Sequence, residues 1–583
     1  MKRTHHIPSG LRTGSLAVAL ALSLPSVFAA DLDLDPGITT IASGTINYDA
    51  LGTVSPGAVL RVDNSANVTF TTAPTLDAGG ILGGWAHSPM SGSPGTGTGN
   101  FLTLDGNAIV ELSSHQTSLD PADWATTDNV KVTAPFTLAG STTIHSLNLD
   151  YNARGVPNGL GPITIGAGNI LTLNSGAVII RANEGNEALG TSGTLASPGN
   201  LYLHVHNGGN RVTNIRPVLS ANGGGGDLVV AGHQVNIATN GPDGWPFVLL
   251  HNSGNTFQDV HVSGTILRIT NTNVLSDSAT KSLHLNGGAF ANDAASNSTL
   301  SRNIVVGENG GLFDSDWNNR TQNYSGTVTL NGDLNIRHRQ GGRTDNFHGV
   351  ISGTGGLILS GGEQRQRVVL NNDNTFTGNV DVSRGTLVVN GSIASGGSFS
   401  LGANGRLEGT GTVDRTIGGS GLVSPGNSPG ILTVDSIDPT GGLDFLFEFT
   451  QADPTYGNAS ASGNDVLRLT NATAFTADFT AGNQITLDFT ALGVLQNADS
   501  FRGGFFTLSD TTPAFENATF QYLGTLADPE LELVFNGMKA QSANFGAGSV
   551  DGYVMEFAVI PEPGTLVLLG IALGCLAIFR RRS

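Results

Sequence analysis

A serine flanked by glycines is the first group in the sequence that could do chemistry. Gly426–Gly430 reads Gly-Asn-Ser-Pro-Gly and satisfies the Gly-x-Ser-x-Gly pattern of hydrolase nucleophile elbows. That chemistry needs a strand before the serine, a helix after it, and Asp and His partners in order. Here prolines flank the serine, an apolar strand-like run follows, and no histidine occurs after His348. The pattern therefore predicts a turn and no catalytic serine.

Carboxylates beside arginines are the second candidate, because some β-helix proteins are polysaccharide lyases or hydrolases that use such groups on successive coils. The closest cluster is Asp314–Trp317, which reads Asp-Ser-Asp-Trp, with Arg302 and Arg320 nearby. Aromatic and acidic residues are also ordinary in loops. The sequence thus leaves a carbohydrate-active enzyme as the alternative to a non-enzymatic protein, with no catalytic residue assigned.

Two patterns resemble metal sites. His204 and His206 alternate in a strand, so both imidazoles face the same side. No Cys or acidic partner lies nearby in sequence, which favours two surface histidines beside Tyr202. Asp31–Asp35 resembles the start of a calcium loop but lacks the required Gly and Glu at positions six and twelve. No metal ligand or cofactor is assigned, and calcium held loosely by scattered turn carboxylates stays open.

Composition limits the fold and the partners. A chain of 583 residues is too long for one compact core, so several domains or one extended repeat are expected. Its 82 glycines, and Asn, Ser and Thr alternating with Val, Ile and Leu, favour short strands joined by tight turns. The formal charge is −19, and −25 without the six basic residues of the terminal signals described below, which excludes nucleic acid as a partner. The single cysteine, Cys575, leaves no disulfide within the chain.

The N-terminus has the three parts of a secretory signal peptide. Residues 1–12 are basic and polar, Leu16–Leu24 is a short apolar run, and Val27 and Ala29 place small residues at the −3 and −1 positions. Cleavage is therefore predicted between Ala29 and Ala30. The expected partners are the Sec translocon and signal peptidase.

The C-terminus also has three parts. Pro561, Glu562 and Pro563 precede Thr565–Phe579, an uncharged apolar run of 15 residues. A stop-transfer cluster follows at once and sets the tail on the cytoplasmic side: Arg580, Arg581 and Arg582. The run is shorter than the ~20 residues that span a bilayer comfortably, which suits a transient anchor.

This C-terminal end resembles the PEP-CTERM sorting domain over residues 559–583. In that family a membrane-embedded cysteine transpeptidase, the exosortase, recognises Pro-Glu-Pro, removes the helix and tail, and passes the body to the envelope or extracellular matrix. The resemblance implies an exosortase as partner, an inner-membrane-anchored precursor, and Pro561, Glu562 and Pro563 as recognition residues. An uncut membrane anchor is the alternative.

The middle of the chain, residues 31–441, repeats one sequence pattern of short strands and turns. Short strands such as those in Gly57–Phe70 alternate with period two and are separated by Asn-Gly, Ser-Gly or Gly-Gly turns. A longer self-match relates Asn255–Ile269 to Asn374–Val389, each with Asn-x-Phe, an apolar strand, a glycine turn and another strand. Such units bury their apolar faces only by stacking, which predicts a parallel β-helix with Asn and Thr side chains bonded along the stack.

Three short motifs carry a second resemblance. Gly353–Leu357, Asn374–Gly378 and Gly385–Leu387 read as G-x-G-x-L, N-x-F-x-G and G-x-L. They resemble the autotransporter-associated β-strand repeat, most clearly over residues 349–434. The resemblance implies a right-handed parallel β-helix exposed at a cell surface.

Residues 442–558 differ in character. Leu443–Phe449 and Gln484–Phe489 alternate strictly and phenylalanine becomes denser, which predicts antiparallel strands in a small β cap. The chain is thus predicted to be all-β, with these parts: signal peptide 1–29, β-solenoid 30–441, β cap 442–558, and sorting signal 559–583 with a single transmembrane helix. The predicted function is an exported structural or adhesin-like surface or matrix protein, with extracellular polysaccharide as a further candidate partner.

Overall fold

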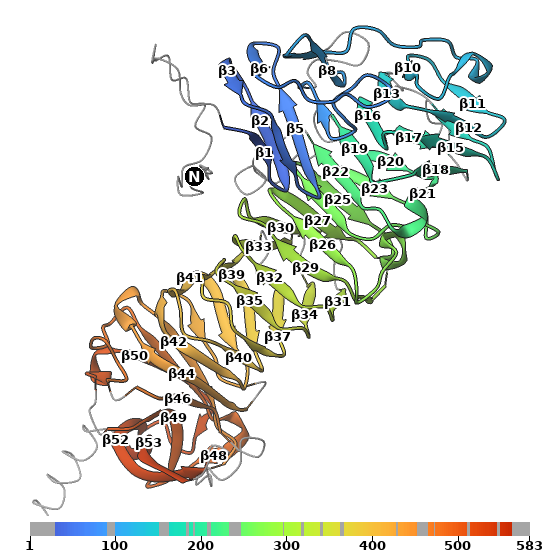
Figure 1. The fold of residues 1–583 in the computed structure, drawn as a ribbon. Coiled ribbons are helices and arrows are strands. Elements are labelled where there is room, and N and C mark those ends of the chain that lie inside the picture. Colours follow the sequence, from blue (N-terminus) through green and yellow to red (C-terminus); the bar gives the residue numbers. More distant parts are fainter. Residues whose placement is uncertain are drawn as a thin grey trace, which may run out of the picture. The chain divides into compact units, whose positions relative to one another are not determined.

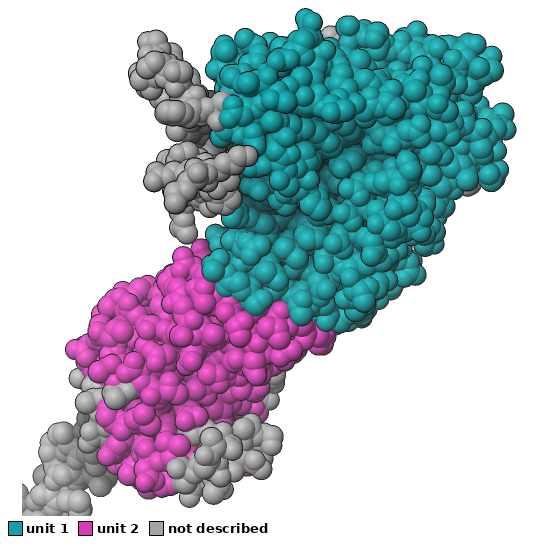
Figure 2. Space-filling view, in the orientation of Figure 1, with its two compact units in different colours: residues 1–343, 352–355 teal, residues 344–351, 356–583 magenta. Residues whose placement is uncertain are grey.

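The computed structural model divides into two compact units, which Figure 2 shows in different colours: residues 1–343 with 352–355, and residues 344–351 with 356–583. It describes residues 30–561 except 90–98, 151–162, 182–185, 191–192, 207–211, 233–246, 295, 316–319, 339–341, 362–365, 427–428, 452–463, 472, 510–512 and 545–548. The described residues form strands and turns, and their helices are 3-10 turns of three or four residues. The predicted all-β solenoid is confirmed.

Unit 1 is mainly a stack of parallel coils (Figure 1). Sheet S1 takes one strand from each coil: β10 (Asn129–Val132), β13 (Ser146–Asp150), β16 (Ala177–Arg181), β19 (Leu201–Val205), β22 (Leu228–Gly232), β24 (Val260–Ser263), β26 (Ser282–Leu285), β29 (Asn303–Val306) and β32 (Val328–Leu330). Sheet S2 holds β11 (Phe136–Leu138), β14 (Ile163–Ile165), β17 (Asn186–Gly190), β20 (Val212–Ile215), β23 (Phe247–Leu250), β25 (Ile266–Ile269), β27 (Gly288–Asn292), β30 (Gly311–Ser315) and β33 (Leu334–His338). Sheet S3 holds β12 (Thr142–Ile144), β15 (Ile170–Leu173), β18 (Thr194–Ser197) and β21 (Val218–Ala221).

In the solenoid core, aliphatic side chains of successive coils lie directly above one another, each on a residue paired with its neighbour in the sheet. One S1 ladder joins Leu147, Val178, Leu203, Val230 and Val262, each at most 1% exposed. Removing one such side chain from water contributes roughly 1.5–3 kcal/mol. Because every coil repeats this burial, the alternation in the sequence sets the register of the stack.

The Asn of the Asn-x-Phe repeat joins neighbouring coils. Asn255 accepts a bond from the Leu219 amide and donates to the Val274 carbonyl, both at 2.8 Å. Asn374 accepts from the Ile351 amide and donates to the Ser392 carbonyl, both at 2.9 Å. Each Asn thereby satisfies backbone groups of the coil before and the coil after, which explains why the repeat needs this amide.

Residues 31–112 form a separate N-terminal lobe within unit 1. Two parallel rungs pair β1 (Leu32–Leu34) with β4 (Leu51–Val54), β2 (Gly37–Ile41) with β5 (Ala58–Val62), and β3 (Gly44–Tyr48) with β6 (Ala66–Phe70). The short β7 (Ala86–His87) adds to β5, and β8 (Leu102–Asp105) and β9 (Ala108–Glu111) form an antiparallel hairpin.

The lobe covers the outer face of S1. Ala177 and Ile179 point away from the solenoid core and pack against Ile81, Phe101 and Leu112 of the lobe. Further along the same face, Val59 of the lobe packs against Val229 and Ala231. The S1 strands beneath the lobe are therefore buried on both faces, unlike an ordinary solenoid strand.

Unit 2 is also a parallel solenoid. Its main strands are β34 (Thr344–Phe347), β36 (Leu357–Ser360), β37 (Arg367–Leu370), β39 (Val380–Val389), β41 (Phe399–Glu408), β42 (Thr412–Gly419), β44 (Ile431–Ile437), β45 (Asp444–Glu448), β46 (Val466–Leu469), β47 (Gln484–Asp488) and β50 (Thr519–Leu523). It ends in three strands with antiparallel pairing: β49 (Ser500–Thr507), β52 (Leu531–Asn544) and β53 (Ser549–Pro561).

The predicted antiparallel pairing within residues 442–558 is wrong for the two alternating runs on which it rested, whereas β49, β52 and β53 do pair in the antiparallel sense. The alternating strands β45 and β47 pair in parallel with each other, and β50 continues the same stack. A solenoid strand and an antiparallel strand bury one face each, so strict alternation does not separate the two. The dense phenylalanines fill the coil interior, where Phe445 and Phe447 lie 4.9 and 5.1 Å from the Phe505 ring.

Candidate functional site

The last strand that the structure describes, β53, reaches the first residue of the Pro-Glu-Pro motif. Strand β53 pairs with β52 up to Pro561, which lies opposite Leu531. On its other side, the Val559 amide donates to the Asp499 carbonyl, and the Val559 carbonyl accepts from Ala498, each at 2.9 Å. The backbone is therefore held from both sides two residues before Pro561.

A buried carboxylate fixes the same strand. Glu556 of β53 accepts bonds from Arg502 at 2.8 Å and from the Asn536 amide at 2.6 Å. Burial opposes ionisation of Glu556, but these two bonds and the nearby Lys539 outweigh burial and lower its pKa. The ionised Glu556 thus ties β53 to β49 and to the point in β52 where the register with β53 shifts.

The sequence at the end of this strand and beyond it indicates the function of the C-terminal segment. Residues 559–582 match the PEP-CTERM protein-sorting motif. The motif implies that the protein is exported to the cell envelope or surface and that an exosortase is its processing partner. Among curated proteins, none matches this chain.

Most residues of the two predicted signals lie outside the described part of the chain. They include Glu562, Pro563, the predicted membrane helix Thr565–Phe579, the stop-transfer arginines and Ala29, whereas Ala30 and Pro561 are described. Within the described residues, no helix is long and apolar enough to cross a membrane.

The Gly-x-Ser-x-Gly segment lies at a turn between coils. Its serine, Ser428, is outside the described residues. The Gly430 amide donates to the Asp465 carboxylate at 2.7 Å, and the Glu448 amide donates to the same group at 2.9 Å. Burial raises the pKa of Asp465 to about 7. Asp465 therefore anchors this turn to the next coil.

Asp314 and Arg302, two of the residues that the enzyme hypothesis grouped, contact different partners in the structure. The buried Asp314 carboxylate contacts Arg337 on the next coil at 3.2 Å. Arg302 instead donates to the carbonyls of Gln258 and Ser282, at 2.7 and 3.0 Å. Asp316 and Trp317 lie outside the described residues, and Arg320 is half-buried.

The interpretation of His204 as a surface residue is wrong. His204 is fully buried, its Nε2 lies 2.7 Å from the Gly84 carbonyl, and its ring centroid lies 4.4 Å from that of His87, with the two rings tilted by 48°. Gly84 and His87 belong to the lobe, whose docking on S1 the alternating pattern of β19 does not reveal. His206 is half-buried, and no group of three His, Cys, Asp or Glu residues in the described chain suits a metal ion.

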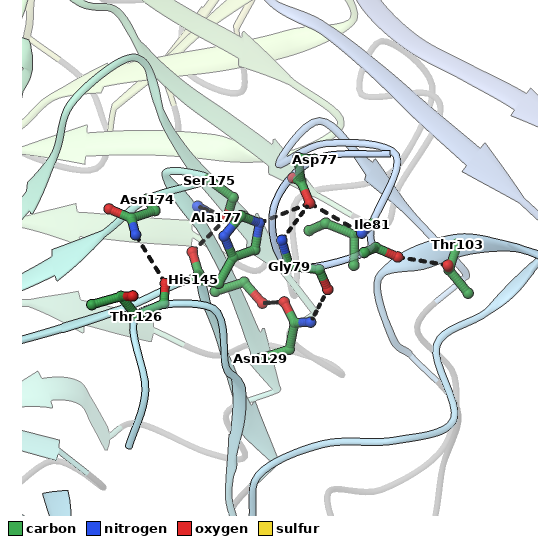
Figure 3. Close-up of polar contacts among 12 residues, drawn as sticks. Asp77, Gly79, Ile81, Thr103, Thr126, Asn129, His145, Asn174, Ser175 and Ala177 are labelled. Atoms are coloured by element: carbon green, nitrogen blue, oxygen red, sulfur yellow. Dashed lines mark hydrogen bonds and ion pairs between the residues drawn. The ribbon is translucent and has the colours of Figure 1, made fainter. Parts of the chain in front are cut away.

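Polar contacts also hold the lobe on S1, and sequence reasoning missed them (Figure 3). The His145 imidazole lies 2.9 Å from Asp77, whose carboxylate also accepts from the Gly79 and Ile81 amides. Asn129 donates to the Gly79 carbonyl at 2.8 Å. A Cβ on Gly79 would lie 2.0 Å from the His145 ring, so this contact requires glycine.

We expect acidification to weaken the docking of the lobe through His204. Burial lowers the His204 pKa from 6.5 to about 4. Stability from the neutral imidazole is therefore present above pH 6.5 and is lost as the pH falls toward 4, by about 2 kcal/mol at pH 5. Hydrogen exchange of lobe amides at pH 7.5 and 5 measures the loss. Because other groups titrate too, the comparison is with His204→Gln, and an equal pH response in both proteins would contradict this role.

Proposed function

We propose that this protein is a non-enzymatic structural or adhesin-like component of the cell surface or extracellular matrix. An exosortase-type transpeptidase recognises Pro561, Glu562 and Pro563, and the signals at the two ends deliver the solenoid body to its place. The observation that supports this proposal is the match of residues 559–582 to a sorting motif, the first three residues of which belong to β53.

The chemistry of the described solenoid supports a structural role. Several of its buried carboxylates form ion pairs, such as Asp150 with Lys131 and Arg181 at 2.9 and 3.1 Å, and Asp293 with Arg268 at 3.0 Å. Such pairs fix neighbouring coils and leave these carboxylates unsuited to general acid or base catalysis. The enzyme alternative gains no support from Asp314, which is paired in the same way.

The test measures both the cellular location of the protein and its ability to cleave polysaccharides. We expect antibodies against the solenoid to label intact cells, and the purified protein to release no reducing ends or unsaturated sugars from a panel of neutral, amino and acidic polysaccharides. Catalysed release that disappears in an Asp314→Asn variant would replace this proposal with the carbohydrate-active enzyme. Unlabelled intact cells would contradict the surface location.

A further inference from the structure

A cavity of about 400 Å³ lies where the N-terminal lobe ends on the outer face of S1. One wall is Asp35–Thr39, at the start of β2, and the other is formed by the turns that follow β26, β29 and β32. The volume lies in the range of ~300–1,000 Å³ that small-molecule sites occupy. The two walls are far apart in the sequence and meet only because the lobe folds back.

The walls of this cavity are fixed by one amide. Asn286 donates to the Pro36 carbonyl of the lobe, and its oxygen accepts from the Asn309 amide of the next turn at 2.9 Å. A Cβ on either Gly37 or Gly307 would lie 2.6 Å from Asn286, so both glycines are needed for this approach. The cavity is therefore built before any ligand arrives.

The lining combines an apolar floor with a polar rim. Ile38 and Val305 are half-buried and offer aliphatic surface, whereas Asp35, Glu308 and Asn331 are exposed around it. His284 stacks on His261 at 4.4 Å within the same face, and burial followed by the His261 charge lowers its pKa. The His284 Nε2 lies 3.4 Å from the Asp259 carboxylate, so this contact already engages one nitrogen of the ring.

We infer that this cavity binds one or two neutral or amino sugar units of an extracellular polysaccharide. A sugar ring presents aliphatic C–H groups on a face and hydroxyls around its edge, which matches an apolar floor inside a rim of carboxylates and amides. The inference rests on the proposed surface function, since that location supplies the ligand.

The charge of the cavity lining determines which class of sugar it favours. The lining contains two carboxylates, Asp35 and Glu308, and neither lysine nor arginine among its described residues. A uronate would meet like charges, whereas a protonated amino sugar would gain a charge-assisted bond. We therefore expect amino sugars to bind best, neutral sugars next and uronates least.

The test uses the full-length protein in a zwitterionic, sugar-free detergent. Saturation-transfer NMR is recorded with hexamers of β-1,4-glucan, chitosan and polygalacturonate as probes. Val305→Trp fills the floor, and we expect it to weaken both favoured probes by at least about tenfold. Glu308→Gln should weaken chitosan more than glucan. Glu530→Gln, at an exposed turn of unit 2, is the matched control and should leave binding unchanged.

Three results would overturn the inference: no transfer to any probe, equal binding of the uronate, or full binding by Val305→Trp with an unchanged unfolding temperature. Antibody labelling of intact cells is read separately. Labelled cells with no sugar binding would leave the surface function standing and remove the cavity's role. Sugar binding by a protein that does not reach the surface would support the role of the cavity and contradict the surface function.

Discussion

The Glu562→Ala variant is expected to accumulate uncut in the inner membrane, with processing reduced by about tenfold or more. Glu562 carries the only charge of the Pro-Glu-Pro motif. Because proline restricts the backbone, a proline on either side of Glu562 favours an extended segment, the form that proteases bind as a strand. The substitution leaves the apolar run and the arginines unchanged, so anchoring persists while recognition is lost. Mass spectrometry of the C-terminal peptide measures the retained fraction.

Glu532→Ala is the matched control for this experiment. Glu532 is an exposed glutamate of β52 that lies opposite Ile560, beside the motif but outside it. We expect this variant to be trimmed like wild type. If the wild-type protein from the envelope retains Arg580–Arg582, or if Glu562→Ala is trimmed at the normal rate, an uncut membrane anchor replaces the sorting interpretation.

Loss of the Arg302 guanidinium should produce a large fall in the stability of unit 1. Its Nε and Nη1 donate to the carbonyls of Leu275, Gln258 and Ser282 at 3.1, 2.7 and 3.0 Å. Burial lowers its pKa to about 10, so it stays charged at neutral pH. Arg302→Ala leaves these buried carbonyls without donors and opens a cavity, at a cost of about 3 kcal/mol or more.

Denaturant unfolding followed by circular dichroism measures this loss. Arg320→Ala, at a half-buried arginine of the same unit, is the control and should cost less than about 1 kcal/mol. An equal effect of the two substitutions would show that the carbonyl contacts of Arg302 contribute little.

The Arg302 contacts also show what a single sequence could and could not predict. The repeat of Asn255 and Phe257 in Asn374 and Phe376 was readable, and it correctly predicted stacked coils. An arginine also belongs to this repeated arrangement, but the sequence did not reveal it, because each arginine lies about two coils after its Asn and Phe. The guanidinium of Arg302 lies 5.7 Å from the Phe257 ring, and that of Arg415 lies 5.1 Å from Phe376.

The docked lobe was missed for a related reason. A signal was present, since residues 177–180 are apolar at outward as well as inward positions, and the whole strand is buried. Such a run predicts that something covers the strand. It does not say what, because the partners Ile81 and Phe101 lie far earlier in the chain, and only the folded structure brings Gly84 to His204.

The pairing of β53 up to Pro561 has a mechanical consequence. If an exosortase joins the body to an acceptor near this residue, tension on that attachment enters the protein along β53. Strands β49 and β52 flank β53 along most of its length, so a pull directed along the β53 axis would load their hydrogen bonds together, in shear, and would not peel them one at a time. A body fastened in this way resists being pulled loose by flow, and its own last strand serves as the fastening.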